Sequence, residues 1–281
     1  MLPELFCPHC QAYLGPSTPA CLCDWERSPD DRLPTPGEPI WSSHVGEAVN
    51  HAAVHGDLVI FSYGSRNGRG GVTALERSSG EGRWSRQTPH AVEGGITLAG
   101  ERLYFATLGF LGSGAELYCL GLEDGAIHWK QDLNGGAWSA PVVQEARVYV
   151  GTDDGRVQCF DSRDGNPVSH RRVSLPAGRN WLVMTDEFLL ALTRNGEIMA
   201  FNPMDLRTCW HQSLETDGEI TGPPTYSRGM IFFGGEGGRV LGLNPRAKRL
   251  KTLAEGMKQV VAQPAAGDGV LYVGAQDHHL H

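Results

Sequence analysis

The sequence has no long apolar run and no recognisable export signal. None of its hydrophobic stretches approaches the ~20 consecutive apolar residues that a membrane-spanning helix needs. The first residues, Met1 to Cys7, lack both the basic start and the extended apolar stretch of a secretory signal. From these two absences we expect a cytoplasmic protein with no membrane segment.

The sequence also has no excess of basic residues. It carries 24 Lys and Arg against 32 Asp and Glu, a formal net charge of -8. Proteins that bind nucleic acids draw much of their affinity from neutralising phosphates with Lys and Arg, so no nucleic-acid partner is expected. Hydrophobic residues make up 40% of the chain, and there are 37 glycines and 17 prolines. This composition indicates a folded protein built from many short strands and tight turns.

Cysteine is unevenly distributed. Four of the seven cysteines are crowded near the N-terminus, whereas Cys119, Cys159 and Cys209 lie far apart. An odd number with one tight cluster is typical of a metal site plus free thiols in a reducing compartment. Cys119 and Cys159 stand where other copies of a repeat described below have Ala or Gly, which favours buried thiols that pack as small apolar groups. The same interpretation is favoured for Cys209.

The N-terminal cysteines have the spacing of a structural metal site. A C-x-x-C pair is followed, after ten residues, by a C-x-C pair, and the predicted ligands are Cys7, Cys10, Cys21 and Cys23. Four thiolates fill the tetrahedral coordination sphere of zinc and leave no open position for catalysis. The second pair is one residue shorter than usual, so His9 or Asp24 stays open as a substitute for Cys23. The segment resembles the small zinc ribbons that open many bacterial multidomain proteins.

The residues after this segment predict a linker. Residues 26–39 contain four prolines, several charges and almost no apolar side chains, so they cannot form a core. We therefore expect a zinc ribbon at 1–25, a Pro-rich linker at 26–38 and a larger domain at 39–281.

A repeat of about forty residues dominates the larger domain. Short β-branched or aromatic stretches recur every 40 to 45 residues, at 58–61, 103–106, 148–151, 189–192, 231–234 and 271–274. A second apolar position recurs in the same phase, at Leu75, Leu120, Phe160, Phe201 and Leu243. Nine residues after each of these stand, in order, Trp84, Trp129, Ser169, Trp210 and Thr252, and Trp41 extends the series backwards. Four strands for each repeat of this length describe a β-propeller blade.

The expected architecture is therefore an all-β propeller of four-stranded blades. A blade cannot bury both of its faces alone, so blades stack around an axis, with the tryptophans packed between neighbours. Five repeats are complete and a sixth begins at Val260. Residues 39–42 match an outer strand, which predicts about six blades, the last closed by this N-terminal strand.

The repeats resemble those of a known family. Residues 140–168 and the L-x-x-x-x-G-x-x-x-W runs at 75–84 and 120–129 are similar to pyrroloquinoline quinone-type (PQQ-like) propeller repeats. The resemblance implies the fold more than the activity, because quinoprotein dehydrogenases, outer-membrane assembly factors and many non-catalytic domains share it. Quinoproteins of this kind hold their cofactor beside a disulfide of adjacent cysteines. This sequence has no such pair, so PQQ is not expected and no catalytic residue is assigned.

The function predicted from these features is a non-catalytic intracellular scaffold that binds protein partners. A PQQ-binding oxidoreductase or sensor and an outer-membrane assembly factor are the alternatives. Trp138 and Trp181 lie outside the repeating tryptophan position, each just ahead of an inner strand, so both are expected near one rim of the ring. They are either partner-binding anchors or plugs of the central channel. The cluster His278, His279 and His281 could chelate a metal ion, but its place at an exposed end makes this the weaker interpretation.

Overall fold

The computed structural model of the chain describes residues 5–6, 13–14, 39–44, 47–65, 68–109, 114–172, 178–216, 218–267, 269–277 and 279–281. The chain forms two compact units, one of Met1–His44 with Ser78–Gly80, the other of Val45–Arg77 with Glu81–His281. In the smaller unit, β1 (Leu5–Phe6) pairs antiparallel with β2 (Tyr13–Leu14). The predicted zinc ligands and the linker at 26–38 lie outside the described residues.

The larger unit consists of antiparallel sheets that follow one another along the chain. The first two sheets comprise β3 (Val49–His55), β4 (Leu58–Gly64), β5 (Gly70–Glu76) and β6 (Gly82–Thr88), then β7 (Ile96–Ala99), β8 (Arg102–Ala106), β9 (Glu116–Gly121) and β10 (Ile127–Asp132). The third comprises β11 (Val142–Gln144), β12 (Arg147–Thr152), β13 (Arg156–Asp161) and β14 (Pro167–Arg172). The fourth and fifth comprise β15 (Asn180–Met184), β16 (Leu189–Thr193), β17 (Glu197–Phe201) and β18 (Thr208–Ser213), then β19 (Thr225–Ser227), β20 (Met230–Gly234), β21 (Val240–Asn244) and β22 (Arg249–Ala254). The last sheet has only β23 (Ala265–Gly267) and β24 (Val270–Tyr272).

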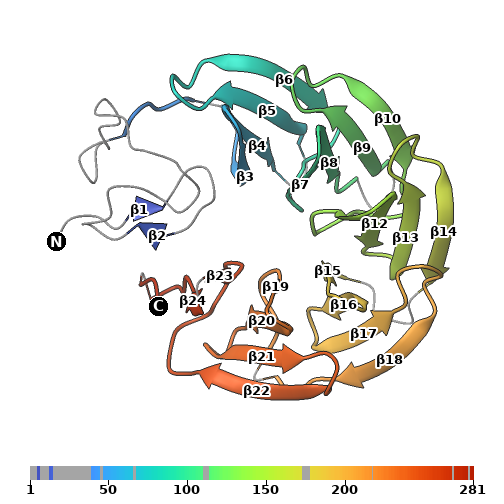
Figure 1. Ribbon diagram of the computed structural model, residues 1–281, viewed down its shortest axis with the longest axis vertical. Coiled ribbons are helices and arrows are strands. Elements are labelled where there is room, and N and C mark those ends of the chain that lie inside the picture. The colour runs from blue at the N-terminus through green and yellow to red at the C-terminus, as the bar shows by residue number, and fades with distance from the viewer. Residues whose placement is uncertain are drawn as a thin grey trace. The chain divides into compact units, whose positions relative to one another are not determined.

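These sheets confirm the predicted blades. Each strand of a four-stranded sheet pairs with the next in chain order, and Figure 1 shows the first strand innermost and the fourth outermost. The inner strands contact one another in the order β3, β7, β11, β15, β19, β23. The described residues of this unit therefore form a β-propeller whose blades follow the forty-residue period.

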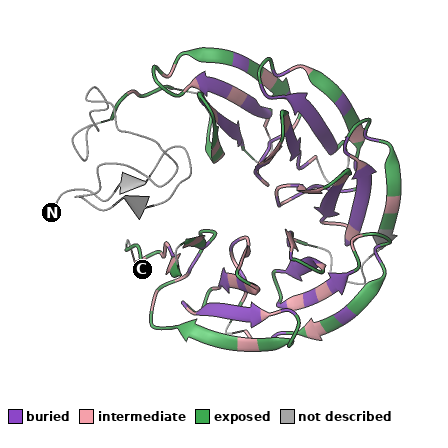
Figure 2. Cartoon of the chain, viewed as in Figure 1, coloured by how far each residue is buried: buried purple, intermediate pink, exposed green. Residues whose placement is uncertain are grey.

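Burial within a blade follows from its stacking. The middle strands contact neighbouring blades on both faces, so they are apolar almost throughout; β9 is buried along its whole length (Figure 2). The outer strands have one edge in solvent and expose most of their residues, as β10 does. On β10 the side chain of Trp129 points inward and is only 8% exposed.

The tryptophans of the outer strands join consecutive blades. The indole N–H of Trp84 donates to the carbonyl of Leu122 (2.8 Å), one blade further on. In the next pair Trp129 repeats this contact with the carbonyl of Ser162 (3.1 Å). In both of these interfaces the indole lies over a glycine with positive φ, and a Cβ on Gly165 (φ +75°) would come within 2.6 Å of the Trp129 ring. The glycine of the G-x-x-x-W run is therefore a packing requirement at these two interfaces, because a side chain there would collide with the ring.

Trp41 makes the same contact inside the smaller unit. Its indole lies over Gly80 (φ +75°), where a Cβ would come within 2.7 Å of the ring. This agrees with the predicted place of Trp41 in the tryptophan series. Residues 39–44, however, form no strand.

The last blade has fewer named strands among the described residues than the other blades. Beyond β24, Gly274 and Leu280 form a bridge, and Val273 and His281 exchange two backbone hydrogen bonds of 2.9 Å. A third strand thus starts at 279–281. Closure of this blade by residues 39–42 stays a prediction.

One blade interface replaces the tryptophan and the glycine together. Ser169 stands in the tryptophan position of the third blade, and Leu206 stands in the glycine position of the fourth. Leu206 is 1% exposed and packs in one cluster with Tyr149 and Cys159. Its backbone keeps the positive φ of the glycines, +55°. The leucine side chain thus fills the space that an indole fills elsewhere.

This exchange predicts strong coupling between the two positions. Ser169→Trp alone is expected to cost about 1–3 kcal/mol of unfolding free energy, because the indole meets the Leu206 side chain. Combining it with Leu206→Gly should recover most of this loss, since the pair then matches Trp129 and Gly165. Denaturant unfolding of the two single variants and the double variant gives the coupling energy. Additive effects of the two substitutions would contradict this packing account.

Candidate partner-binding site at the propeller axis

A polar concave surface lies where the inner strands converge. A pocket of ≈ 330 Å³ is lined from several blades, among others by His51, Glu93, Trp138, Arg179 and Trp181. The loops before the inner strands approach closely here, and a Cβ on Gly94 would come within 2.7 Å of the backbone of Ser139. The blades therefore hold these side chains on a rigid frame near the axis, which we call the axial pocket.

Trp138 is the central aromatic group of the axial pocket. The guanidinium carbon of Arg179 lies 4.3 Å from the centre of the Trp138 ring, within the range of a cation–π interaction. The indole N–H of Trp138 donates to Oδ2 of Asp153 (3.4 Å), and Oδ1 of Asp153 accepts from the backbone N–H of Gly136 (2.9 Å). The ring is half-buried. A fixed, partly exposed indole stacked with a cation is typical of residues that anchor a protein partner.

Trp181 has a different environment. It lines the same pocket but is only 3% exposed, and it packs in an apolar cluster with Leu192 and Ile198. The sequence interpretation treats the two tryptophans alike, whereas the structure places Trp138 in a loop and Trp181 within β15. The strand pattern from 180 to 184 was the signal that distinguishes them, because it puts Trp181 in a blade interface.

His51 adds a polar group that the sequence does not single out as part of this pocket. Its Nδ1 atom is buried and has no hydrogen-bond partner among the described residues. Burial lowers the pKa of His51, which favours a neutral imidazole at neutral pH. His55, at the far end of β3, is exposed. The axial pocket thus combines an indole, a guanidinium, an imidazole and a carboxylate.

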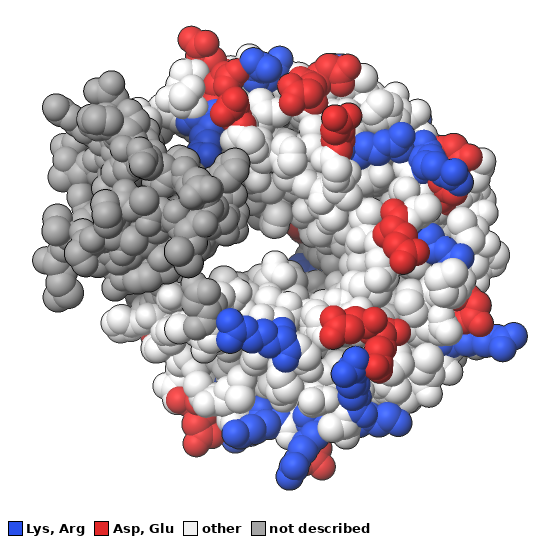
Figure 3. Space-filling view, in the orientation of Figure 1, with Lys and Arg blue, Asp and Glu red and all other residues white. Residues whose placement is uncertain are grey.

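Charge is mixed over the surface around the blades. On the face that Figure 3 shows, Lys and Arg side chains alternate with Asp and Glu, and no large area of the coloured residues carries one sign.

The three cysteines of the propeller are free thiols in two kinds of environment. Cys119 and Cys159 are fully buried in the blades, as their small-residue positions suggest. Cys209 is exposed, although it was expected to be a packed thiol. On a strand, neighbouring side chains point to opposite faces, and the inward side chain here is Trp210.

These environments predict selective alkylation. Burial raises the pKa of Cys159 to about 11, and burial also raises that of Cys119, so both stay protonated at pH 8. At this pH iodoacetamide should modify Cys209 and leave Cys119 and Cys159 intact until the protein unfolds, because the thiolate is the reacting species. Peptide mass spectrometry of the native and the denatured protein measures this. Equal labelling of the three residues in the native protein would contradict the burial described here.

The repeated four-stranded blades with a tryptophan between neighbours define a propeller of PQQ-like repeats. The sequence profile of the family described as "Outer membrane protein assembly factor BamB" matches residues 34–109, 68–179 and 154–274, which together span most of the chain. The chain belongs to this family.

Curated relatives carry the same name. BamB of Moranella endobia (strain PCIT) is 27% identical over 141 residues, which are 45% of this chain and 35% of that relative. BamB of Escherichia coli (strain K12) is 24% identical over 309 residues, covering 86% of this chain and 76% of the relative. The chain thus spans about a third of the first relative and three quarters of the second.

Solved structures confirm the fold. The crystal structure of BamB from Moraxella catarrhalis has a TM-score of 0.57 at 19% identity, covering 86% of this chain and 84% of that one. The computationally designed Ika8 protein has a TM-score of 0.62 at 14% identity, covering 83% and 70%. Similarity to a designed protein shows that the architecture alone does not fix a function.

The comparisons correct one prediction from the sequence. The cytoplasmic location is wrong, because the curated relatives are named outer membrane protein assembly factors. That name describes an assembly factor rather than an enzyme, in agreement with the non-catalytic function expected here. In the part of the chain that the structure describes, no helix has the length and apolar character to cross a membrane.

Proposed function

We propose that this chain is a non-catalytic factor that binds other proteins during the assembly of outer membrane proteins. The observation that carries the proposal is the match of nearly the whole propeller to the assembly-factor family. The outer-membrane assembly factor, one of the alternatives from the sequence, is therefore preferred to an intracellular scaffold. The prediction that the chain binds protein partners is kept.

The axial pocket is the surface that we assign to a partner. Trp138 and Arg179 belong to the residue types that dominate the energetics of protein interfaces. His51 offers an unpaired buried nitrogen, and Glu93 offers a carboxylate, to polar groups of the partner. Because the blades hold these groups in place, little conformational entropy would be lost on binding.

Site-specific cross-linking tests this assignment. A photoreactive phenylalanine at Glu93, at the axial pocket, should give adducts with outer-membrane assembly proteins in the organism that encodes the chain. The same residue at His128, an exposed position on β10, is the control and should give far fewer. Equal adducts from the two positions would refute the axial site, and adducts with cytosolic proteins alone would refute the function.

The N-terminal cysteines support a second, separate proposal. Cys7, Cys10, Cys21 and Cys23 would hold one structural zinc ion, with His9 or Asp24 as substitute ligands. Native mass spectrometry should show bound zinc that is lost with chelator, one zinc fewer in the Cys7→Ser variant than in the wild type, and no adduct with added PQQ. A metal-free chain with the mass deficit of two disulfide bonds would overturn the zinc assignment, and a stoichiometric quinone adduct would revive the oxidoreductase alternative.

A further inference from the structure

Three potential metal ligands converge at the turn after β24. Oδ2 of Asp277 lies 2.8 Å from Nε2 of His281, and Oδ1 of the same carboxylate lies 3.8 Å from Nδ1 of His279. One donor atom from each residue can be chosen so that all three lie within 4.8 Å of one another. Two ligands on a tetrahedral ion at about 2.0–2.1 Å are about 3.3 Å apart, so small side-chain rotations suffice to bind a common ion.

The backbone explains why these side chains meet. Leu280 pairs with Gly274, which places His279 and His281 on the same face of the incipient third strand, because alternate residues share a face. Asp277 sits in the turn, where Oδ1 accepts a hydrogen bond from the backbone N–H of His279 (3.0 Å). The hairpin therefore preorganises the three groups before any ion binds.

The equivalent turn of the third blade shows what is unusual here. Gly151 pairs with Val157 there, in the register of Gly274 with Leu280, so Asp277 corresponds to Asp154 and His279 to Arg156. Asp154 and Arg156 form an ion pair of 2.7 Å. Arginine stays protonated and cannot bind a metal.

The last blade replaces that arginine with an imidazole and adds a second one. His281 takes the place of Gln158, a buried residue whose amide N–H contacts Thr152. An ion pair that only holds a turn thus becomes a set of two imidazoles and one carboxylate. Of the described turns of this type, this one alone gathers such a set.

The donor set defines the class of ion. Imidazole nitrogens with one carboxylate suit zinc and related late transition-metal ions rather than calcium or magnesium. The side chains of His279, His281 and Asp277 are 74%, 39% and 20% exposed, so an ion from solvent can reach them. Three protein ligands would leave a position open for water or for a group from a partner.

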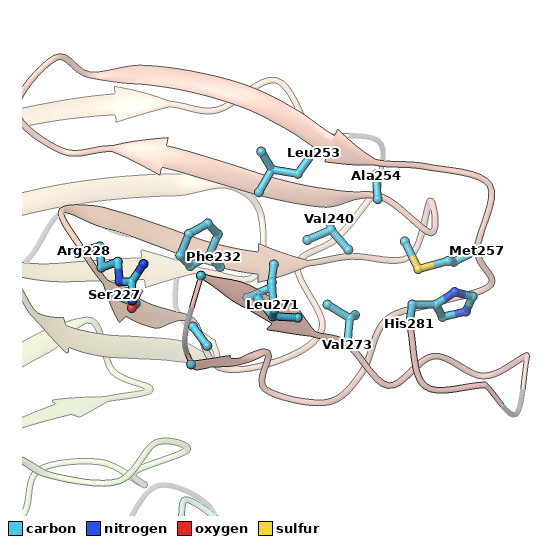
Figure 4. A pocket seen from close by; sticks show the side chains of 14 residues that line it. Ser227, Arg228, Phe232, Val240, Leu253, Ala254, Met257, Leu271, Val273 and His281 are labelled. Atoms are coloured by element: carbon cyan, nitrogen blue, oxygen red, sulfur yellow. The ribbon is translucent and has the colours of Figure 1, made fainter. Parts of the chain in front are cut away.

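We propose that Asp277, His279 and His281 form a zinc-type metal site that fastens the third strand of the last blade to the turn after β24. His281 also borders a groove of ≈ 500 Å³ between the last two blades, where Figure 4 shows it near Met257 and Val273. Because the ion would tie the turn to the incipient third strand, it would order this end of the groove. The site is distinct from the N-terminal cysteines and does not depend on the proposed function.

Zinc titration of the full chain by calorimetry, after removal of metal with a chelator, tests the proposal. The wild type should bind one more equivalent than the His279→Gln/His281→Gln variant, because that variant loses two ligands. Asp277→Asn should weaken the same equivalent at least about tenfold, as loss of even an outer partner of a metal ligand does. His211→Gln is the matched control, since His211 is an exposed histidine paired with one carboxylate, Glu197, at 2.5 Å. It should bind zinc as the wild type does.

Hydrogen exchange gives a readout that does not rely on counting ions. Zinc should slow exchange of the amides of Val273 and His281, which pair across the hairpin, in the wild type but not in the double variant. Circular dichroism of both proteins establishes that each is folded. An equal number of zinc equivalents in the wild type and the double variant would overturn the proposal, as would identical exchange with and without zinc.

Discussion

Replacing Trp129 with alanine should destabilise the propeller by about 3–5 kcal/mol, the usual cost of removing a large buried aromatic side chain. Trp129 is 8% exposed, lies over Gly165, and has its ring centre 5.9 Å from that of Tyr104. The substitution opens a cavity between two blades and removes the hydrogen bond to the carbonyl of Ser162. Denaturant unfolding followed by circular dichroism measures the loss.

His128→Ala provides the matched control for this prediction. His128 is the neighbour of Trp129 on β10 and is exposed, so its truncation should change the free energy of unfolding by less than about 0.5 kcal/mol. If Trp129→Ala were as mild as the control, the tryptophans would not be the anchors between blades, and the account of the repeat would fail.

Replacing Trp138 with alanine should weaken the binding of a protein partner by at least about 2 kcal/mol, roughly thirtyfold in Kd. The half-buried ring carries the stacked Arg179 and presents apolar area at the axial pocket. Because it lies in a loop rather than in a blade core, the unfolding midpoint should change little. Calorimetry with the purified partner found by cross-linking at Glu93 measures the affinity.

Two further variants make the test of Trp138 specific. Trp138→Phe keeps an aromatic ring and should retain more affinity than Trp138→Ala. Trp181→Ala removes a side chain that is 3% exposed, so it should lower stability more than Trp138→Ala does. Unchanged affinity in Trp138→Ala, with the fold intact, would exclude Trp138 as a partner anchor.

The sequence predicts the blades well because they repeat. Strand alternation, the Leu or Phe position and the G-x-x-x-W spacing are local features, and each copy reinforces the others. The packing of Leu206 in place of an indole, opposite Ser169, could not be predicted in this way, because it depends on a contact between two blades. The exposure of Cys209 was within reach of the strand alternation, since the inward position next to it belongs to Trp210.

The axial pocket could be predicted only in part. Trp138 stands out because it breaks the repeat, but its partners Asp153 and Arg179 come from other loops, and no spacing rule brings them together. The location was inferred from the absence of a secretory signal and of a long apolar run and from the cysteine pattern, and that inference was wrong. The family to which the repeats belong is the better guide.

The most direct test of the proposed function is to delete the gene in its own organism and to quantify the proteins of the outer membrane. We predict that several outer membrane proteins fall in abundance in the isolated membrane, that the wild-type gene restores them, and that the Trp138→Ala gene restores them less. An unchanged outer membrane proteome, with the protein itself recovered in the cytosolic fraction, would contradict the account.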